Sequence, residues 1–398
     1  MVKTRFLFLV GCVFLFAGCG LLGRSERANP EVLQIAHGRL GNEASLVQSG
    51  DSLVAVYSDW ETTGLYDVVL PISDRLPTVA PAPTMIDKID MALPLSSSFG
   101  EHVAAVCGNT TTVMYLVRAS EDKMILKVAT RDAGEPAWTV DALERPGDPV
   151  AILPVGPDRM ELFWAAGSLL HVTYPGAGQA ESLMEPFVLE ERGATFGASP
   201  GADSSAFFAD RQTLQGVSAY NSALHSLFLF RWNGSTYDPV KINGAGPVHS
   251  SLLLSDGSVA VLSWDPATRR LELVVQGPGE SRLSQSLVTM SNGTSKVALL
   301  PQGESSGHST GSRPAATSDH LLFLYDEARL LGGGRVLYEL CLLTPGSGWG
   351  PVARKYRKLI LASGAEPIVD FSALETNGRL YVLVHQDGLK LLGLKLPR

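Results

Sequence analysis

Residues 258–276 read SVAVLSWDPATRRLELVVQ, two apolar runs joined by a short turn that carries Asp265 and Pro266. Short apolar runs bounded by turn residues predict buried β-strands. This pair of runs recurs along the chain. The first run of each pair, called the first run below, begins at Leu53, His102, Met160, Ser205, Ser258, Leu321 and Arg379. Their mean spacing of about 54 residues suits a repeated four-stranded sheet. The sequence therefore predicts an all-β fold, a seven-bladed β-propeller.

The segments around these runs fit the same interpretation. A turn signal precedes each first run, for example Gly50-Asp51 before Leu53 and Asn377-Gly378 before Arg379; tight hairpins need such residues because they adopt positive φ. Upstream lies a small-residue stretch, such as ASLVQSG at residues 44–50, which suits a crowded innermost strand. Downstream come outer-strand candidates. Six or eight blades stay open as alternatives, and a pair of β-sandwiches is the other architecture considered.

The two ends of the chain are expected to meet in one blade. The last unit ends at Leu396 with its third strand, whereas VLQIAHG at residues 32–38 is left without a unit. Placed as the outermost strand of the last blade, this segment closes the ring and removes an exposed edge. We therefore expect one propeller domain over residues 31–398, with the polar tract Gly303–Ser312 as a flexible insert.

The amino terminus carries an export signal. Lys3 and Arg5 precede an apolar run, Phe6–Phe16, which ends in Ala17-Gly18-Cys19. This arrangement resembles a bacterial lipoprotein signal peptide over residues 1–18, although Phe16 stands where such signals usually carry Leu. The resemblance implies a diacylglycerol on the Cys19 thiol, cleavage before Cys19, and acylation, for example by palmitate, of the new amino terminus. An ordinary secretory signal is the alternative.

A lipid anchor would tether the chain without inserting it. The apolar run is too short for a bilayer core, which needs about 20 helical residues, whereas several acyl chains hold a protein stably. Residues 19–30 are then a lipidated, flexible tether, and the bilayer is a partner through Cys19. The absence of Asp at position 20 implies, by resemblance, sorting to the outer membrane of the cell envelope, with the membrane face left open.

Charge and cysteine content narrow the choice of partners. Removing residues 1–18, with Lys3 and Arg5, changes the formal net charge from -8 to -10, which predicts no nucleic-acid partner. Cys107 and Cys341 remain after Cys12 is removed and Cys19 is lipidated. A disulfide between them is possible in an exported protein, but the repeat places them in non-neighbouring units, so two buried thiols are preferred.

An acidic ring is the candidate ligand site. Most first runs end in an acid, namely Asp59, Asp210, Asp265, Asp326 and Asp387, with Asn109 at the equivalent place in the second unit. Loops that follow equivalent strands of a propeller share one face, and Trp60 and Trp264 adjoin two of the acids. Carboxylates and aromatic rings together could take a cationic, sugar or peptide ligand. The alternative is that Asp is a common turn residue.

Signals for other chemistry are weak. Gly197–Gly201 matches Gly-x-Ser-x-Gly around Ser199, but strands flank it on both sides and Pro200 lacks the N–H of an oxyanion hole. The histidines lack zinc-site spacing, and no phosphate-binding, dinucleotide or calcium loop is present. The basic cluster Arg354–Lys358 is interpreted as a solvated outer strand. The sequence predicts no catalytic residue, metal or cofactor, so we expect that the protein is not an enzyme.

Three functions follow from these features. The first is a non-catalytic binding scaffold that holds a protein or glycan partner at the membrane. The second is a subunit of envelope assembly, because lipid-anchored propellers of the outer-membrane β-barrel assembly complex have a similar architecture. Their repeated Gly, Asp/Asn and Trp pattern is missing here, with Trp138 and Trp349 as the only hints. The third is a polysaccharide-active enzyme, which would need two carboxylates about 5 to 10 Å apart.

Overall fold

The computed structural model describes residues 26–88, 99–107, 110–120, 123–132, 135–143, 148–154, 160–165, 169–174, 205–209, 214–221, 226–232, 237–242, 246–254, 257–277, 282–290, 292–302, 320–329, 333–342 and 359–396. Within these ranges every regular element is a β-strand. No helix of the described ranges is long and apolar enough to cross a bilayer.

The described strands form seven sheets, which we number as blades in chain order. From the innermost strand outward, the first three blades contain β3 (Leu40–Ser49), β4 (Ser52–Asp59), β5 (Gly64–Pro71) and β6 (Thr84–Lys88); β7 (Phe99–Cys107), β8 (Thr110–Ser120), β9 (Lys123–Asp132) and β10 (Thr139–Leu143); and β11 (Asp148–Pro154), β12 (Met160–Ala165) and β13 (Leu169–Tyr174).

The other four blades follow the same order. They contain β14 (Ser205–Ala209), β15 (Leu214–Asn221), β16 (Ser226–Trp232) and β17 (Tyr237–Ile242); β18 (Val248–Leu253), β19 (Val259–Asp265), β20 (Arg270–Gln276) and β21 (Arg282–Thr289); β22 (Val297–Gln302), β23 (His320–Ala328), β24 (Gly334–Leu342), β25 (Leu359–Gly364) and β1 (Glu26–Arg27); and β26 (Asp370–Thr376), β27 (Arg379–His385), β28 (Leu389–Lys395) and β2 (Glu31–Ala36).

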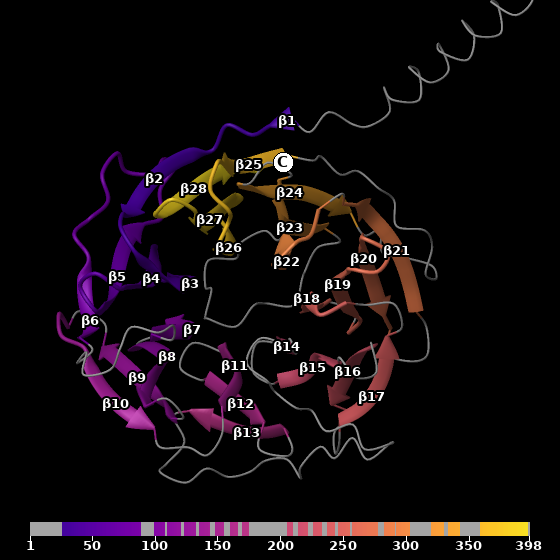
Figure 1. The fold of residues 1–398 in the computed structure, drawn as a ribbon, viewed down its shortest axis with the longest axis horizontal. Coiled ribbons are helices and arrows are strands. Elements are labelled where there is room, and N and C mark those ends of the chain that lie inside the picture. Colours follow the sequence, from indigo (N-terminus) through magenta and orange to yellow (C-terminus); the bar gives the residue numbers. More distant parts are fainter. Residues whose placement is uncertain are drawn as a thin grey trace, which may run out of the picture.

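The blades are arranged in a ring around a central axis (Figure 1). Their innermost strands contact one another in a closed cycle, from β3 through β7, β11, β14, β18, β22 and β26 back to β3. The all-β propeller arrangement predicted from the repeated strand pairs is thus the observed one.

Closure of the ring follows the prediction from the leftover amino-terminal strand. β2 pairs antiparallel with β28, with Val32 opposite Leu392, and so forms the outermost strand of blade 7. The structure differs from the predicted flexible tether, residues 19–30, in the last residues of that segment. β1 pairs in parallel with β25, and the Ala28 N–H donates to the Ile360 carbonyl at 3.0 Å. Residues 26–28 are therefore held on the outer edge of blade 6.

Two of the seven units are assigned differently by the structure. The runs that begin at His102 and Ser205 belong to β7 and β14, which are the innermost strands of blades 2 and 4 rather than the second strands. The sequence interpretation missed β8 and β15, which follow them. β15 contains Gly216 and Ser218, which interrupt its apolar run, whereas β8 has an apolar run, Val113–Val117, that the pairing of the β7 run with the β9 run passed over.

The hydrophobic core lies between the blades. β19 sends Val259 and Val261 toward blade 4, whereas its Ala260 and Leu262 pack against blade 6. A strand that is buried on both faces reads as a continuous apolar run, which explains the pattern at residues 258–276. Each fully buried Val or Leu side chain contributes about 1.5 to 3 kcal/mol to stability.

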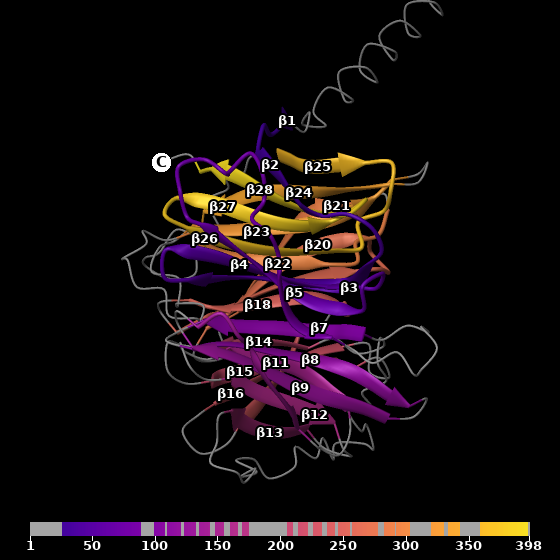
Figure 2. The ribbon, with the colours of Figure 1, turned by 90° about the vertical axis from the view of Figure 1, so that its left-hand side faces the viewer.

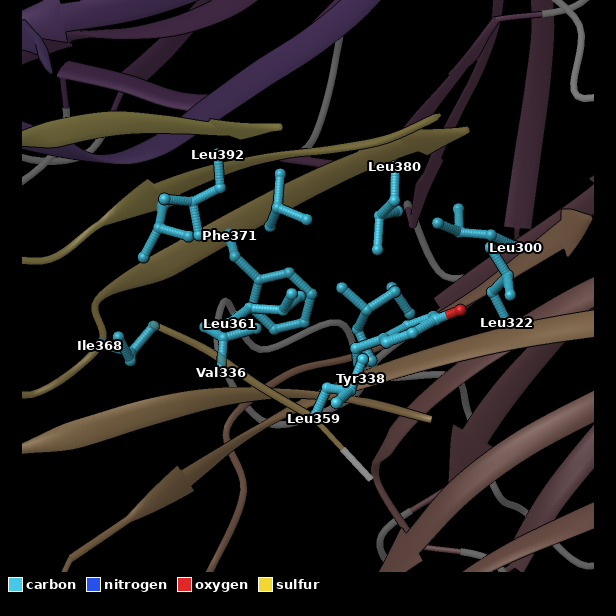
Figure 3. Packing of buried hydrophobic residues seen from close by; sticks show 14 of the residues in the cluster. Leu300, Leu322, Val336, Tyr338, Leu359, Leu361, Ile368, Phe371, Leu380 and Leu392 are labelled. Atoms are coloured by element: carbon cyan, nitrogen blue, oxygen red, sulfur yellow. The ribbon is translucent and has the colours of Figure 1, made fainter. Parts of the chain in front are cut away.

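The interface between blades 6 and 7 shows this packing from close by (Figure 3). Phe371 and Leu380 of blade 7 face Val336 and Tyr338 of blade 6, and all four side chains are at most 1% exposed. Ala28 packs against the same cluster. The amino-terminal segment is therefore joined to the core at this interface as well as to the sheet edge.

Candidate functional site

One face of the ring gathers most of the predicted site residues, and we call it the 2–3 face. It carries the turns between second and third strands and the connections that lead into the innermost strands, since neighbouring strands are antiparallel. Hydrogen bonds join turn to connection: the Trp60 N–H donates to the Arg39 carbonyl at 2.8 Å, and the Met290 N–H donates to the Arg269 carbonyl at 2.9 Å.

The carboxylates of Asp59 and Asp265 are engaged within their own turns. Asp59 Oδ1 accepts the backbone N–H of Glu61 at 2.8 Å. Asp265 accepts the Ala267 N–H at 2.9 Å and the Thr268 hydroxyl at 2.7 Å. These are the local bonds by which Asp stabilises a turn.

Asp326 is the most fully engaged of the predicted acids. Its carboxylate accepts the Thr294 hydroxyl at 2.8 Å, the Ser295 N–H at 2.9 Å, the Ser295 hydroxyl at 2.8 Å and the Lys296 N–H at 2.7 Å. The residue is only 6% exposed. Asp326 therefore fixes the connection that leads into β22, a role that the sequence did not indicate.

The remaining predicted positions fall into two groups. Asp387 is exposed in the turn between β27 and β28 with φ of 50°. The other positions lie outside the described residues: Cys19, Asn109, Ser199, Asp210, Trp349, and the segments Gly303–Ser312 and Arg354–Lys358. β7 and β14 precede Asn109 and Asp210 and are innermost strands, so their carboxyl ends point to the face opposite the 2–3 face. The predicted acidic positions therefore do not all lie on the same face of the ring.

The two predicted tryptophans have different surroundings. Trp264 is half-buried and packs against the core between blades 5 and 6. Trp60 is also half-buried, but the exposed Arg39 guanidinium carbon lies 5.2 Å from the centre of its ring. The backbone N–H of Arg39 donates to Glu61 Oε1 at 3.3 Å. Arg39, Trp60 and Glu61 form a cluster at the surface, which we call the Arg39–Trp60 cluster.

A second charged group lies where the innermost strands of blades 6 and 7 begin, and the sequence analysis missed it. Lys296 Nζ is 2.5 Å from Asp370 Oδ1, and the two side chains are 42% and 8% exposed. Asp370 also accepts the Ala44 N–H at 3.2 Å. Because Lys296 and Asp370 lie at the start of blades 6 and 7 and Ala44 lies in blade 1, this network links the innermost strands of three blades.

Small polar side chains of the innermost strands also form hydrogen bonds between neighbouring blades. The Ser372 hydroxyl of β26 accepts the Leu46 N–H of β3 at 3.2 Å, and the Ser250 hydroxyl of β18 accepts the Leu299 N–H of β22 at 3.1 Å. The inner edge of each sheet carries unpaired backbone groups. Serine from one blade satisfies such a group in the next. These serines belong to the small-residue stretches of the sequence, so the pattern contained a signal for the contacts between blades.

Burial shifts the ionisation of two groups near these sites. Burial, helped by the negative charge of Asp59, raises the pKa of Tyr57 to about 12. Burial lowers the pKa of His249, whose ring nitrogens lie 3.0 Å from the Pro247 carbonyl and 3.1 Å from the Ser218 carbonyl. This histidine therefore has a structural environment. Among the described residues, no group of three or more His, Cys, Asp or Glu could hold a metal ion.

The topology also bears on the two remaining cysteines. Cys107 ends β7 in blade 2, and Cys341 lies in β24 of blade 6. These blades are not neighbours in the ring (Figure 1). A disulfide requires Cα atoms within about 7 Å, so the arrangement disfavours a bond between the two cysteines of one chain.

No family model matches the chain, and no curated protein matches it in sequence. Solved structures match nearly all of it: YCF48 from Cyanidioschyzon merolae has 13% identity, a TM-score of 0.55 and coverage of 92% of this chain and 99% of that chain. YCF48 bound to D1 peptide has 12% identity, a TM-score of 0.51 and coverage of 94% and 97%. The β-propeller domain of the Trilobed protease from Pyrococcus furiosus has 9% identity, a TM-score of 0.47 and coverage of 88% and 95%.

The chain is a β-propeller. At these identities the likeness concerns the fold alone, since one propeller architecture serves binding proteins and enzymes.

Proposed function

We propose that this propeller is a non-catalytic scaffold of the bacterial cell envelope, anchored to the outer membrane by lipid on Cys19, that binds a segment of another protein through its 2–3 face. The Arg39–Trp60 cluster carries the proposal. Its guanidinium is exposed over a half-buried indole on a turn that the backbone bond from Trp60 to Arg39 holds in place. Tryptophan and arginine are the residues most enriched among binding hot spots.

The fold and the engaged acids support a scaffold over an enzyme. YCF48, which has this fold, has been solved with a D1 peptide bound, and rigid propeller loops suit such binding. The polysaccharide enzyme would need two carboxylates poised for acid–base work. Asp59 and Asp265 instead accept hydrogen bonds from their own turns, and Asp326 accepts them from the connection that leads into β22.

Site-specific photo-crosslinking in cells tests the binding face. A photoreactive amino acid at Glu61, in the Arg39–Trp60 cluster, is expected to give a protein adduct. The matched position is Asp51, exposed in the β3–β4 turn on the opposite face, where we expect none. Trp60→Ala should weaken the complex by about 2 kcal/mol, roughly thirtyfold in Kd, and Arg39→Ala should weaken it with an unchanged melting temperature because Arg39 is exposed.

Equal adduct yields at Glu61 and Asp51, or an adduct at Glu61 that both substitutions leave unchanged, would contradict binding through the 2–3 face. The identity of the adduct also separates the general scaffold from the assembly subunit. An outer-membrane barrel protein as the adduct would make the assembly subunit the specific form of this function.

The anchor has its own test. Cys19→Ser is expected to abolish incorporation of labelled palmitate and to prevent processing at residue 19, because the thiol is the acceptor of the lipid. The matched control is Cys12→Ser, which alters the segment removed with the signal and should leave labelling intact. Palmitate incorporation that survives Cys19→Ser would show that the anchor lies elsewhere.

A further inference from the structure

The amino-terminal segment is fixed to the ring at one place on its circumference. β1 pairs with β25, and the Ala28 N–H donates to the Ile360 carbonyl at 3.0 Å. Directly afterwards β2 pairs along β28. We call the outer strands β25, β1 and β2 the anchor edge; it lies on the outer rim of the ring in both ribbon views (Figures 1 and 2).

Charged contacts strengthen this attachment. Glu31, the first residue of β2, has Oε2 at 2.9 Å from Arg379 Nη2, and the same oxygen accepts the Leu76 N–H at 2.6 Å. Arg379 also donates to the Asp74 carbonyl. Since residues 26–36 are bonded to blades 6, 7 and 1, the only chain available as slack between Cys19 and the ring is the segment before Glu26.

The length of that slack is short relative to the ring. Seven residue steps separate Cys19 from Glu26, and an extended chain covers at most about 3.5 Å per residue, or about 25 Å in total. A compact domain of this size is roughly 50 Å across. The propeller therefore cannot stand on the opposite rim, near β10 and β17, because the anchor edge would then lie about 50 Å from the bilayer that holds Cys19.

We propose that the anchor edge is a membrane-facing surface, where the rim of blades 6 and 7 contacts the headgroup layer and the propeller stands edge-on. This inference rests on the lipidation of Cys19 in the proposed function. Val32, on β2, is 60% exposed, an apolar side chain on this edge that gains from burial in the interfacial layer. Both faces of the ring then open sideways along the membrane, which leaves the 2–3 face accessible to a membrane-associated partner.

Energy transfer to a lipid-headgroup acceptor measures this orientation in the full lipidated chain reconstituted in phospholipid vesicles. Donor dyes are placed at Val32→Cys on the anchor edge and at Ala142→Cys and Lys241→Cys, exposed positions on β10 and β17 of the far rim. Cys107 and Cys341 are replaced by serine in every sample. We expect transfer at Val32→Cys to exceed that at the far positions several-fold.

Two further positions and one spacer make the outcome decisive. Glu61→Cys and Asp51→Cys report on the 2–3 face and the opposite face, and edge-on contact predicts similar, intermediate transfer at both. A long Gly/Ser spacer inserted before Glu26 should reduce the difference between Val32→Cys and the far positions. Equal transfer at all positions, or the highest transfer at Glu61→Cys or Asp51→Cys, would overturn the proposal; failure of the protein to bind vesicles, with no palmitate on Cys19, would instead refute the anchor.

Discussion

Replacing Asp326 with alanine is expected to lower the free energy of unfolding by about 3 kcal/mol, because hydrogen bonds to a charged acceptor contribute about 1.5 to 3 kcal/mol each and donors left behind are penalised. The carboxylate accepts four hydrogen bonds from Thr294, Ser295 and Lys296 and is nearly buried. Asp326→Asn keeps one acceptor oxygen and should lose about half as much. Chemical denaturation followed by tryptophan fluorescence measures both values.

Asp265→Ala is the matched control for this prediction. Asp265 ends the equivalent strand of blade 5 but holds only its own exposed turn, so its loss should cost no more than about 1 kcal/mol. If Asp326→Ala left stability unchanged and abolished partner binding, the carboxylate would belong to a ligand site, as the acidic-ring hypothesis holds.

The parts of the fold that the sequence predicted share a physical cause. Second strands such as β19 and β23 are buried on both sides between blades, so their apolar runs mark the repeat directly. The closing strand β2 could be predicted because the last unit had only three strands and residues 32–38 had no unit of their own. β15 was missed because glycine and serine interrupt its apolar pattern, whereas β8 was missed although it carries the apolar run Val113–Val117. Each omission shifted one unit by one strand.

The candidate site was less predictable because its contacts join distant positions. Asp370 meets Lys296, 74 residues away, and Ala44, 326 residues away. No local pattern marks either contact. By contrast, Asp59 and Asp265 bond to residues only two or three positions further along the chain. This turn role is local, and it could be named from the sequence as the alternative to a ligand site. The Arg39–Trp60 cluster required the register of the β3–β4 hairpin, in which Leu40 pairs with Asp59 and so places Arg39 beside Trp60.

Asp67→Ala is expected to have the largest effect on stability, a loss of about 3 to 5 kcal/mol, because it leaves a largely buried charge without its partner. Asp67 lies in β5 of blade 1, and its side chain is 0% exposed. Arg131 Nη2 of blade 2 lies 2.8 Å from Asp67 Oδ2, and the Trp138 indole N–H donates to Oδ1 at 3.3 Å. The Arg131 guanidinium is stacked 4.3 Å from the Trp138 ring centre.

The double variant Asp67→Ala with Arg131→Met separates the charge from the packing. Methionine retains an apolar chain against Trp138 and removes the unpaired guanidinium, so we expect the double variant to be more stable than Asp67→Ala alone, since replacing both members of a buried pair is often nearly neutral. Thermal and urea denaturation of the four proteins in this cycle give the coupling energy directly. A coupling near zero would mean that the Asp67–Arg131 ion pair does not stabilise the interface, and that blades 1 and 2 are held by their apolar contacts and by the bonds of Tyr115 and Lys127 to Asp87.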